Sequence, residues 1–101
     1  SYFAFTSLDF GAVGSGRVVV RLAVPDTSSA RRFDLRLDSP TGPIIGTHSP
    51  TGTGGWATFV DQNVTFAGAT GVRDLYVVGA GLINGIANID RITIIPAAPS
   101  S

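Results

Sequence analysis

The sequence predicts an all-β fold, and three features of its composition and pattern support this. The 101 residues include no Lys, Glu or Met, so the chain lacks three of the residues that most favour helices. Its 13 Gly stand among many Ser and Thr residues, a mixture typical of tight turns. Apolar and polar residues alternate along much of the chain, and Val and Ile are frequent. Short segments of this kind, spaced roughly 8–12 residues apart, are typical of a sandwich or a barrel.

The first half of the chain shows the alternation most clearly. Residues 2–10 are aromatic-rich and strand-like, and several Gly residues break the chain after them. In residues 17–24 the apolar side chains recur at every second position, which places one face of this strand in the core. In residues 31–38, Phe33 and two Leu residues alternate with charged residues, which makes this the best-defined strand.

Shorter segments follow in the second half. A turn is expected at Asp38-Ser39-Pro40-Thr41-Gly42, where the Asp and Ser side chains bond nearby amides and Pro restricts φ. The strands expected after this turn are residues 44–47, 56–66, 75–78 and 86–95. The second of these is one strand or two, with a break near residues 61–63. His48 is expected in an exposed turn before Pro50.

Charge and residue types exclude several classes of function. Seven Arg balance seven Asp and the formal net charge is zero, which argues against nucleic acid or an anionic membrane as partner. No apolar run reaches the ~18 residues of a membrane helix. The absence of Cys excludes disulfides, metal thiolates and cysteine nucleophiles. A glycosidase needs an opposed pair of carboxylates; the chain has no Glu, and although Asp residues can form such a pair, no loop gathers them. We therefore expect no catalytic residue.

Several motifs occur in an order that resembles one known family. They are Leu8-Asp9-Phe10-Gly11, Arg36-Leu37-Asp38-Ser39-Pro40-Thr41-Gly42, Gly46-Thr47, Thr53-Gly54-Gly55-Trp56, Gly71-Val72-Arg73-Asp74-Leu75-Tyr76 and Asn88-Ile89-Asp90. In this order they resemble carbohydrate-binding module family 6, from Tyr2 to about Ile94. The resemblance implies a jelly-roll β-sandwich of two antiparallel sheets that binds polysaccharide without catalysis. It also implies an accessory module of a secreted glycoside hydrolase, with xylan, cello-oligosaccharides, β-1,3-glucans or agarose-type chains as ligands.

The chain divides into a domain and a tail. Residues 1–95 form the expected β-sandwich domain, because a chain of this length holds one domain. Residues 96–101, Pro-Ala-Ala-Pro-Ser-Ser, have the composition of a linker to the catalytic module of a larger enzyme. No signal peptide is visible, so an exported protein would be represented here by its mature part.

Trp56, the only Trp, is the first residue expected at the sugar site. A sugar ring presents an apolar face of C–H groups, which stacks on a flat and rigid aromatic side chain. Trp56 follows a Gly-rich segment, and the resemblance matches it to the family's stacking Trp. The alternative is a core Trp packed between the sheets.

Asn88 is the second residue expected at the sugar site. Its amide offers two donors and an acceptor, which suits the paired hydroxyl groups of a sugar. The resemblance matches it to a sugar-binding Asn in the same site as the Trp. The alternative is an Asn at a turn or strand edge that bonds its own backbone.

The resemblance also implies that Asp90 helps to hold a structural calcium. Asp90 shares one side of its strand with Asn88 if the strand is regular. Calcium takes roughly six to eight oxygen ligands, and in the family the acidic partners come from a further N-terminal stretch, which also carries an aromatic wall of the sugar site. Residues 1–5 resemble the strand after that stretch, so we expect a weak or empty calcium site. The alternative for Asp90 is an ion pair with an Arg such as Arg91 or Arg17, which contributes little if exposed.

Two functions are compatible with these observations. The first is a non-catalytic module that binds xylan-type or β-glucan-type polysaccharide and attaches a linked enzyme to it. The second is a structural or protein-interaction β-sandwich that has lost sugar binding and pairs through its edge strands. Fold alone does not separate the two.

Overall fold

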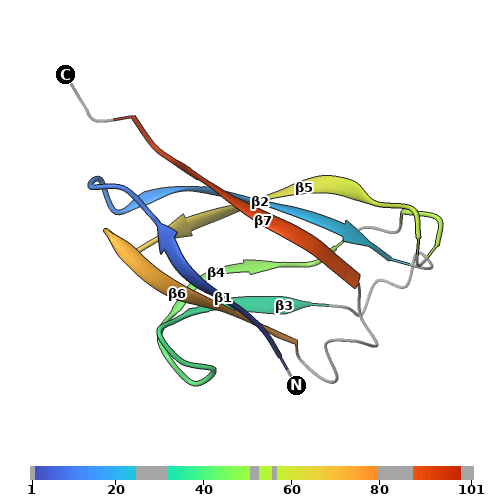
Figure 1. Ribbon diagram of the computed structural model, residues 1–101, viewed down its shortest axis with the longest axis horizontal. Coiled ribbons are helices and arrows are strands. Elements are labelled where there is room, and N and C mark those ends of the chain that lie inside the picture. Colours follow the sequence, from blue (N-terminus) through green and yellow to red (C-terminus); the bar gives the residue numbers. More distant parts are fainter. Residues whose placement is uncertain (1, 25–31, 51–52, 56, 80–87, 99–101) are drawn as a thin grey trace.

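The computed structural model is a β-sandwich of two sheets (Figure 1). It describes residues 2–24, 32–50, 53–55, 57–79 and 88–98. The strands, in chain order, are β1 (Tyr2–Asp9), β2 (Ser15–Ala23), β3 (Phe33–Leu37), β4 (Ile44–His48), β5 (Val60–Ala67), β6 (Val72–Gly79) and β7 (Asn88–Pro96). No helix that could cross a membrane occurs among the described residues.

Each sheet joins strands that are distant in the sequence. One sheet has the order β1-β6-β3-β4 and the other has the order β5-β2-β7. Every pair of neighbouring strands is antiparallel, and the two sheets form separate layers (Figure 1). The predicted jelly-roll sandwich of two antiparallel sheets is therefore confirmed.

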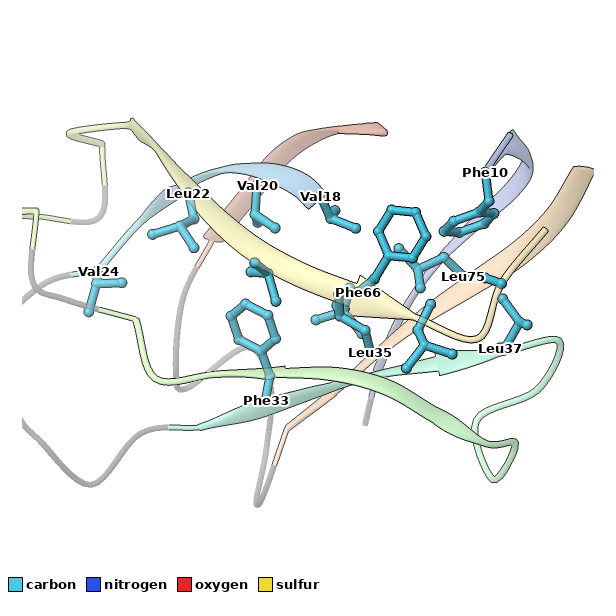
Figure 2. Packing of buried hydrophobic residues seen from close by; sticks show 14 residues of the cluster. Phe10, Val18, Val20, Leu22, Val24, Phe33, Leu35, Leu37, Phe66 and Leu75 are labelled. Atoms are coloured by element: carbon cyan, nitrogen blue, oxygen red, sulfur yellow. The ribbon is translucent and has the colours of Figure 1, made fainter. Parts of the chain in front are cut away.

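The core lies between the inner faces of the two sheets (Figure 2). The central strand β2 and the central strand β3 both bury every second side chain. These buried side chains are Val18, Val20 and Leu22 in β2 and Phe33, Leu35 and Leu37 in β3. The predicted alternation is confirmed in both strands, because successive side chains of a strand point to opposite faces of the sheet.

Strand β5 is continuous through the segment where a break was expected. Residues 61–63 pair with β2, with Asp61 opposite Arg21 and Asn63 opposite Val19. The expected break is wrong because the ladder to β2 satisfies the backbone whatever the side chains are, and Asp61 and Asn63 are exposed on the outer face. Polar residues at these positions mark the solvent face of one strand and not a turn.

The sandwich has two sides at which the edges of the two sheets meet, and these sides are packed differently. On one side β4 approaches β5 of the other sheet so closely that a Cβ added at Gly46 would lie 2.6 Å from the carbonyl oxygen of Thr65. On the other side lie β1 and β7, whose apolar side chains pack on the core but are only partly buried. These are Phe3, Phe5, Leu8, Ile89, Ile92 and Ile94. The side formed by β4 and β5 is therefore the tightly closed one.

His48 helps to close the tight side and is not an exposed turn residue. It is the last residue of β4, opposite Phe33 of β3, and it is half-buried. Its Nε2 lies 2.8 Å from Oε1 of Gln62 in β5, and its ring centroid lies 5.5 Å from that of Phe33. The expectation was wrong because β4 extends one residue further than predicted, which places His48 between the sheets.

The turn between β3 and β4 has the expected position but a different role for Asp38. Gly42 N–H donates to the Ser39 carbonyl over 3.0 Å, as in a tight turn. The Asp38 side chain does not bond nearby amides but accepts hydrogen bonds from Arg73 in β6, with Nε of Arg73 3.0 Å from Oδ1. These hydrogen bonds lower the pKa of Asp38 below its ordinary value. The partner is Arg73 because β6 is the neighbour of β3 in the sheet.

The close approach of β4 to β5 predicts a stability effect at Gly46. The Gly46→Ala variant should lose roughly 1–3 kcal/mol of the free energy of unfolding, because the new methyl group forces two sheets apart. Urea unfolding measures this loss. Gly55→Ala is the matched control, since its added Cβ would lie 3.7 Å from Thr58 Oγ1, an ordinary contact. Equal free energies of unfolding for the two variants would contradict the close approach.

Candidate functional site

The end of β2 places Asn88 and the segment that precedes Trp56. Ala23, the last residue of β2, pairs with Asn88, the first residue of β7. Val24, directly after it, is hydrogen-bonded to Thr53, which precedes Trp56 by three positions in the sequence. The central strand therefore brings the start of β7 and the segment leading to Trp56 to the same end of the sandwich.

Thr53 is bound to Val24 through its backbone and through its side chain. Its N–H donates to the Val24 carbonyl over 3.1 Å, and its Oγ1 accepts from the Val24 N–H over 2.9 Å. The hydroxyl also lies 3.2 Å from the Val24 carbonyl oxygen. Val24 is fully buried, so its polar backbone groups need partners within the protein. Thr53 supplies them and anchors this segment to β2.

The residues on either side of Trp56 have a defined backbone. Gly54 has φ of 106°, in the left-handed region that favours glycine. Thr58 N–H donates to the Gly55 carbonyl over 3.3 Å. Trp56 itself lies outside the described residues, so its predicted role as the stacking residue stays a prediction.

Asn88 is exposed at the start of β7. Ile89, the next residue, packs on the core, whereas Asn88 and Asp90 are both exposed. The expected alternation therefore holds over these three residues. An exposed amide at the same end of the sandwich as Thr53 has the chemistry to bond sugar hydroxyl groups, although a direct role of Asn88 in binding stays a prediction.

Asp90 occupies a β-bulge. Leu22 pairs with Ile89 and Arg21 pairs with Arg91, so Asp90 is the additional residue on β7. A bulge of this kind locally disrupts the ladder and redirects side chains. The bulge explains why exposed and partly buried residues do not alternate regularly along the whole of β7, since the adjacent residues Asp90 and Arg91 are both exposed.

The carboxylate of Asp90 faces an arginine. Its Oδ2 lies 3.5 Å from Nε of Arg21, and Oδ1 of Asp61 lies 3.5 Å from Nη1 of the same Arg21. The alternative of an exposed ion pair with an Arg is confirmed, and the partner is Arg21, which was not among the two examples named, Arg17 and Arg91. The reason is the register, which brings β5 and β7 to the two sides of β2 at this residue.

The described residues do not by themselves form a carboxylate cluster around Asp90 for calcium. Among the described residues, no group of three or more His, Cys, Asp or Glu could hold a metal ion. Calcium takes roughly six to eight oxygen ligands, and a guanidinium beside the carboxylate opposes a second cation. A structural calcium would need more oxygen ligands than Asp90 provides, and it stays a prediction.

Thr53 is the residue at this end whose contribution sequence analysis missed. It stands in a motif that was noticed for its Trp, and a hydroxyl residue before two glycines is a recognisable signal for a bond to the backbone. Its partner Val24 is 29 residues earlier. No local pattern reveals a pair at that distance, so only the folded chain identifies it.

Comparison with known proteins assigns the chain to a family. The family model described as carbohydrate binding module (family 6) matches residues 1–96, nearly the whole chain. The chain therefore belongs to carbohydrate-binding module family 6. Modules of this family are non-catalytic, in agreement with the expectation that the chain is not an enzyme.

Curated relatives are enzymes that act on xylan-type polysaccharides by name. The chain is 33% identical over 90 residues to the arabinoxylan arabinofuranohydrolase of Paenibacillus polymyxa, which covers 88% of this chain. It is 34% identical over 80 residues to endo-1,4-beta-xylanase A of Thermoclostridium stercorarium, which covers 79% of this chain. The chain spans 14% and 15% of the lengths of these enzymes and is thus similar to one part of each.

Solved structures of the family have the same fold. A family 6 carbohydrate-binding module from Clostridium cellulolyticum, in complex with xylose, is 34% identical with a TM-score of 0.74, over 91% of this chain and 69% of that one. The module CsCBM6-3 from Clostridium stercorarium, in complex with cellobiose, is 27% identical with a TM-score of 0.77, over 95% and 67%. The similarity agrees with the two-sheet sandwich described above.

The exposed position of Asp90 predicts a small effect of its removal. The Asp90→Asn variant should lose no more than about 1 kcal/mol of the free energy of unfolding in calcium-free buffer, because partly exposed ion pairs contribute little. Thermal unfolding with and without calcium checks this. A rise of the wild-type Tm with calcium that is lost in Asp90→Asn would instead establish Asp90 as a metal ligand.

Proposed function

We propose that this chain binds β-linked polysaccharide of the xylan or β-glucan type and holds a linked glycoside hydrolase on it. The observation that carries the proposal is the family match over residues 1–96. Two relatives that are themselves modules of the family are bound to xylose and to cellobiose. The xylose ring and each glucose ring of cellobiose differ in one hydroxymethyl group, and a site built on ring stacking accepts both kinds of ring.

The proposed chemistry of binding combines an aromatic face with an amide. Trp56 stacks on the apolar face of one sugar ring, and Asn88 hydrogen-bonds the hydroxyl groups at its edge. The anchoring of Thr53 to Val24 supports this arrangement, because it brings the segment before Trp56 to the end of β2 where Asn88 begins β7. Neither residue supplies an acid, a base or a nucleophile.

Such a module acts by holding the enzyme to which it is linked close to the polysaccharide. The chain spans a small part of the curated relatives, and residues 96–101 have the composition of a linker. Binding of the module raises the local concentration of a linked enzyme at the polysaccharide, so an affinity of about 1 mM to 1 μM suffices. Because insoluble polysaccharides lie outside cells, we also propose that the protein is secreted.

A structural or protein-interaction role is the second candidate, and one observation favours it. The inward apolar side chains of β1 and β7 are only partly buried, and strand edges pair readily with other chains. Analytical ultracentrifugation of the chain separates the two candidates. The protein-interaction role requires the chain to associate with another chain, whereas sugar binding does not.

The single Trp makes the proposed function directly testable. Titration with xylotetraose, cellotetraose and laminaritetraose should give a saturable change of the Trp fluorescence with at least one sugar, because stacking alters the surroundings of the indole. Trp56→Ala should abolish binding to insoluble xylan or β-glucan and keep the β-sheet circular dichroism. A variant that unfolds would show that Trp56 is a core residue, and wild-type protein that binds none of the sugars would contradict the proposed function.

Asn88 provides an independent test with a matched control. Asn88→Ala should weaken binding by roughly 1–3 kcal/mol, the usual effect of removing one partner of a buried hydrogen bond. Asn63→Ala is the control, since Asn63 is an exposed amide on β5 whose side chain accepts a hydrogen bond from Arg17. Isothermal titration calorimetry with the sugar identified above measures both. An Asn88→Ala affinity equal to that of the control would remove Asn88 from the site.

A further inference from the structure

We infer that the Thr53 hydroxyl is a positioning group, which fastens the segment before Trp56 to the end of β2 and thereby sets the sugar affinity without touching the sugar. The inference rests on the proposed function, because it assigns a role within the same site. It concerns a residue to which the chemistry of sugar recognition assigned no role.

The connection that contains Trp56 is closed at its base. It leaves β4 at His48 and enters β5 at Val60. The hydrogen bond of 2.8 Å between His48 and Gln62 ties these two strands together across the sheets, and the ring of Phe33 packs on His48. The residues between the two strands therefore start and end at fixed points of the scaffold.

Thr53 adds a second fixed point in the middle of this connection. The pair of hydrogen bonds between Thr53 and Val24 resembles one step of an antiparallel ladder, except that the hydroxyl oxygen takes the place of a backbone carbonyl as acceptor for the Val24 N–H. An apolar side chain such as that of Val or Ala cannot accept this hydrogen bond. The fixed point at Val24 thus depends on the residue type at position 53.

The hydroxyl also lies near the residue just before Trp56, and it donates its one proton either to the Val24 carbonyl or to the Gly55 carbonyl. Thr53 Oγ1 lies 3.4 Å from the Gly55 carbonyl oxygen, the same oxygen that accepts the hydrogen bond from Thr58 N–H. Between Thr53 and Gly55 stands Gly54 at φ of 106°, where any other residue would be strained. One side chain thus organises the backbone that leads directly to Trp56.

An ordered segment favours binding because less conformational freedom is lost when the sugar arrives. Fixing one side chain at an interface opposes binding by an amount that corresponds to about a tenfold change of Kd. Removal of the hydroxyl should therefore raise Kd for the sugar by about tenfold. It does so by making the segment less ordered in the sugar-free protein, and it removes no contact with the sugar. The hydroxyl alone is responsible, so a serine at this position should behave as the wild type does.

The experiment compares three variants with the wild-type chain. Thr53→Val keeps the shape and removes the hydroxyl, Thr53→Ser keeps the hydroxyl, and Thr65→Val is the matched control on the exposed face of β5. Time-resolved anisotropy of the single Trp without sugar reports how tightly its segment is held. Fluorescence titration with xylotetraose and cellotetraose then gives Kd for each variant.

We expect faster local depolarisation and a Kd about tenfold higher for Thr53→Val alone, with Thr53→Ser and Thr65→Val close to the wild type. Unchanged anisotropy in Thr53→Val would overturn the inference, and so would increased motion with an unchanged Kd. A wild-type chain that binds no sugar would contradict the proposed function, whereas the sugar-free anisotropy would still decide whether Thr53 holds the segment. If Thr53→Val loses its β-sheet signal, Thr53→Ala leaves space for a water at the Val24 amide and is judged by the same outcomes.

Discussion

Burial of the inner face of β2 against the opposite sheet is the constraint on which the remaining structure depends. Among the strands that the structure describes, β2 is the only one of its sheet with neighbours on both edges, and Val18, Val20 and Leu22 are completely buried. Full burial of such side chains stabilises the fold by about 1.5–3 kcal/mol each. Because the burial continues into Val24, the backbone there needs internal partners. The site end of the molecule is built on this requirement, since Thr53 meets it and Asn88 starts β7 beside it.

As in other sandwich proteins, the sheets provide the stability and one end of the molecule provides the candidate site. A rigid pair of sheets holds loops at its ends, and such loops carry most binding residues. Here the hydrogen bond between His48 and Gln62 closes the tight side, and the Thr53–Val24 pair holds the segment that leads to Trp56. A few specific polar contacts therefore link an apolar core, which confers stability, to an exposed end, which confers function.

The outer face of the β5-β2-β7 sheet is polar and, unlike the core, contributes little to stability. Arg21 stands between Asp61 and Asp90 at 3.5 Å from each, and all three side chains are at least about a third exposed. Exposed pairs of this kind contribute little stability. Asp90, which resemblance to the family assigned to a metal, is one of the two carboxylates that share this arginine.

The sequence by itself determined the strands, the buried faces and the family, and these are matters of local pattern. Alternation at period two identified the inward residues of β2 and β3 because side chains of a strand alternate between faces. It also pointed to Trp56 and Asn88 as the residues with the right chemistry for a sugar. Only the tertiary structure decided that β5 is unbroken, that Asp90 sits in a bulge beside Arg21, that His48 lies between the sheets, and that Thr53 binds Val24. Each of these depends on the register between segments far apart in the chain, and register is set by packing of the whole sandwich, which no local pattern contains.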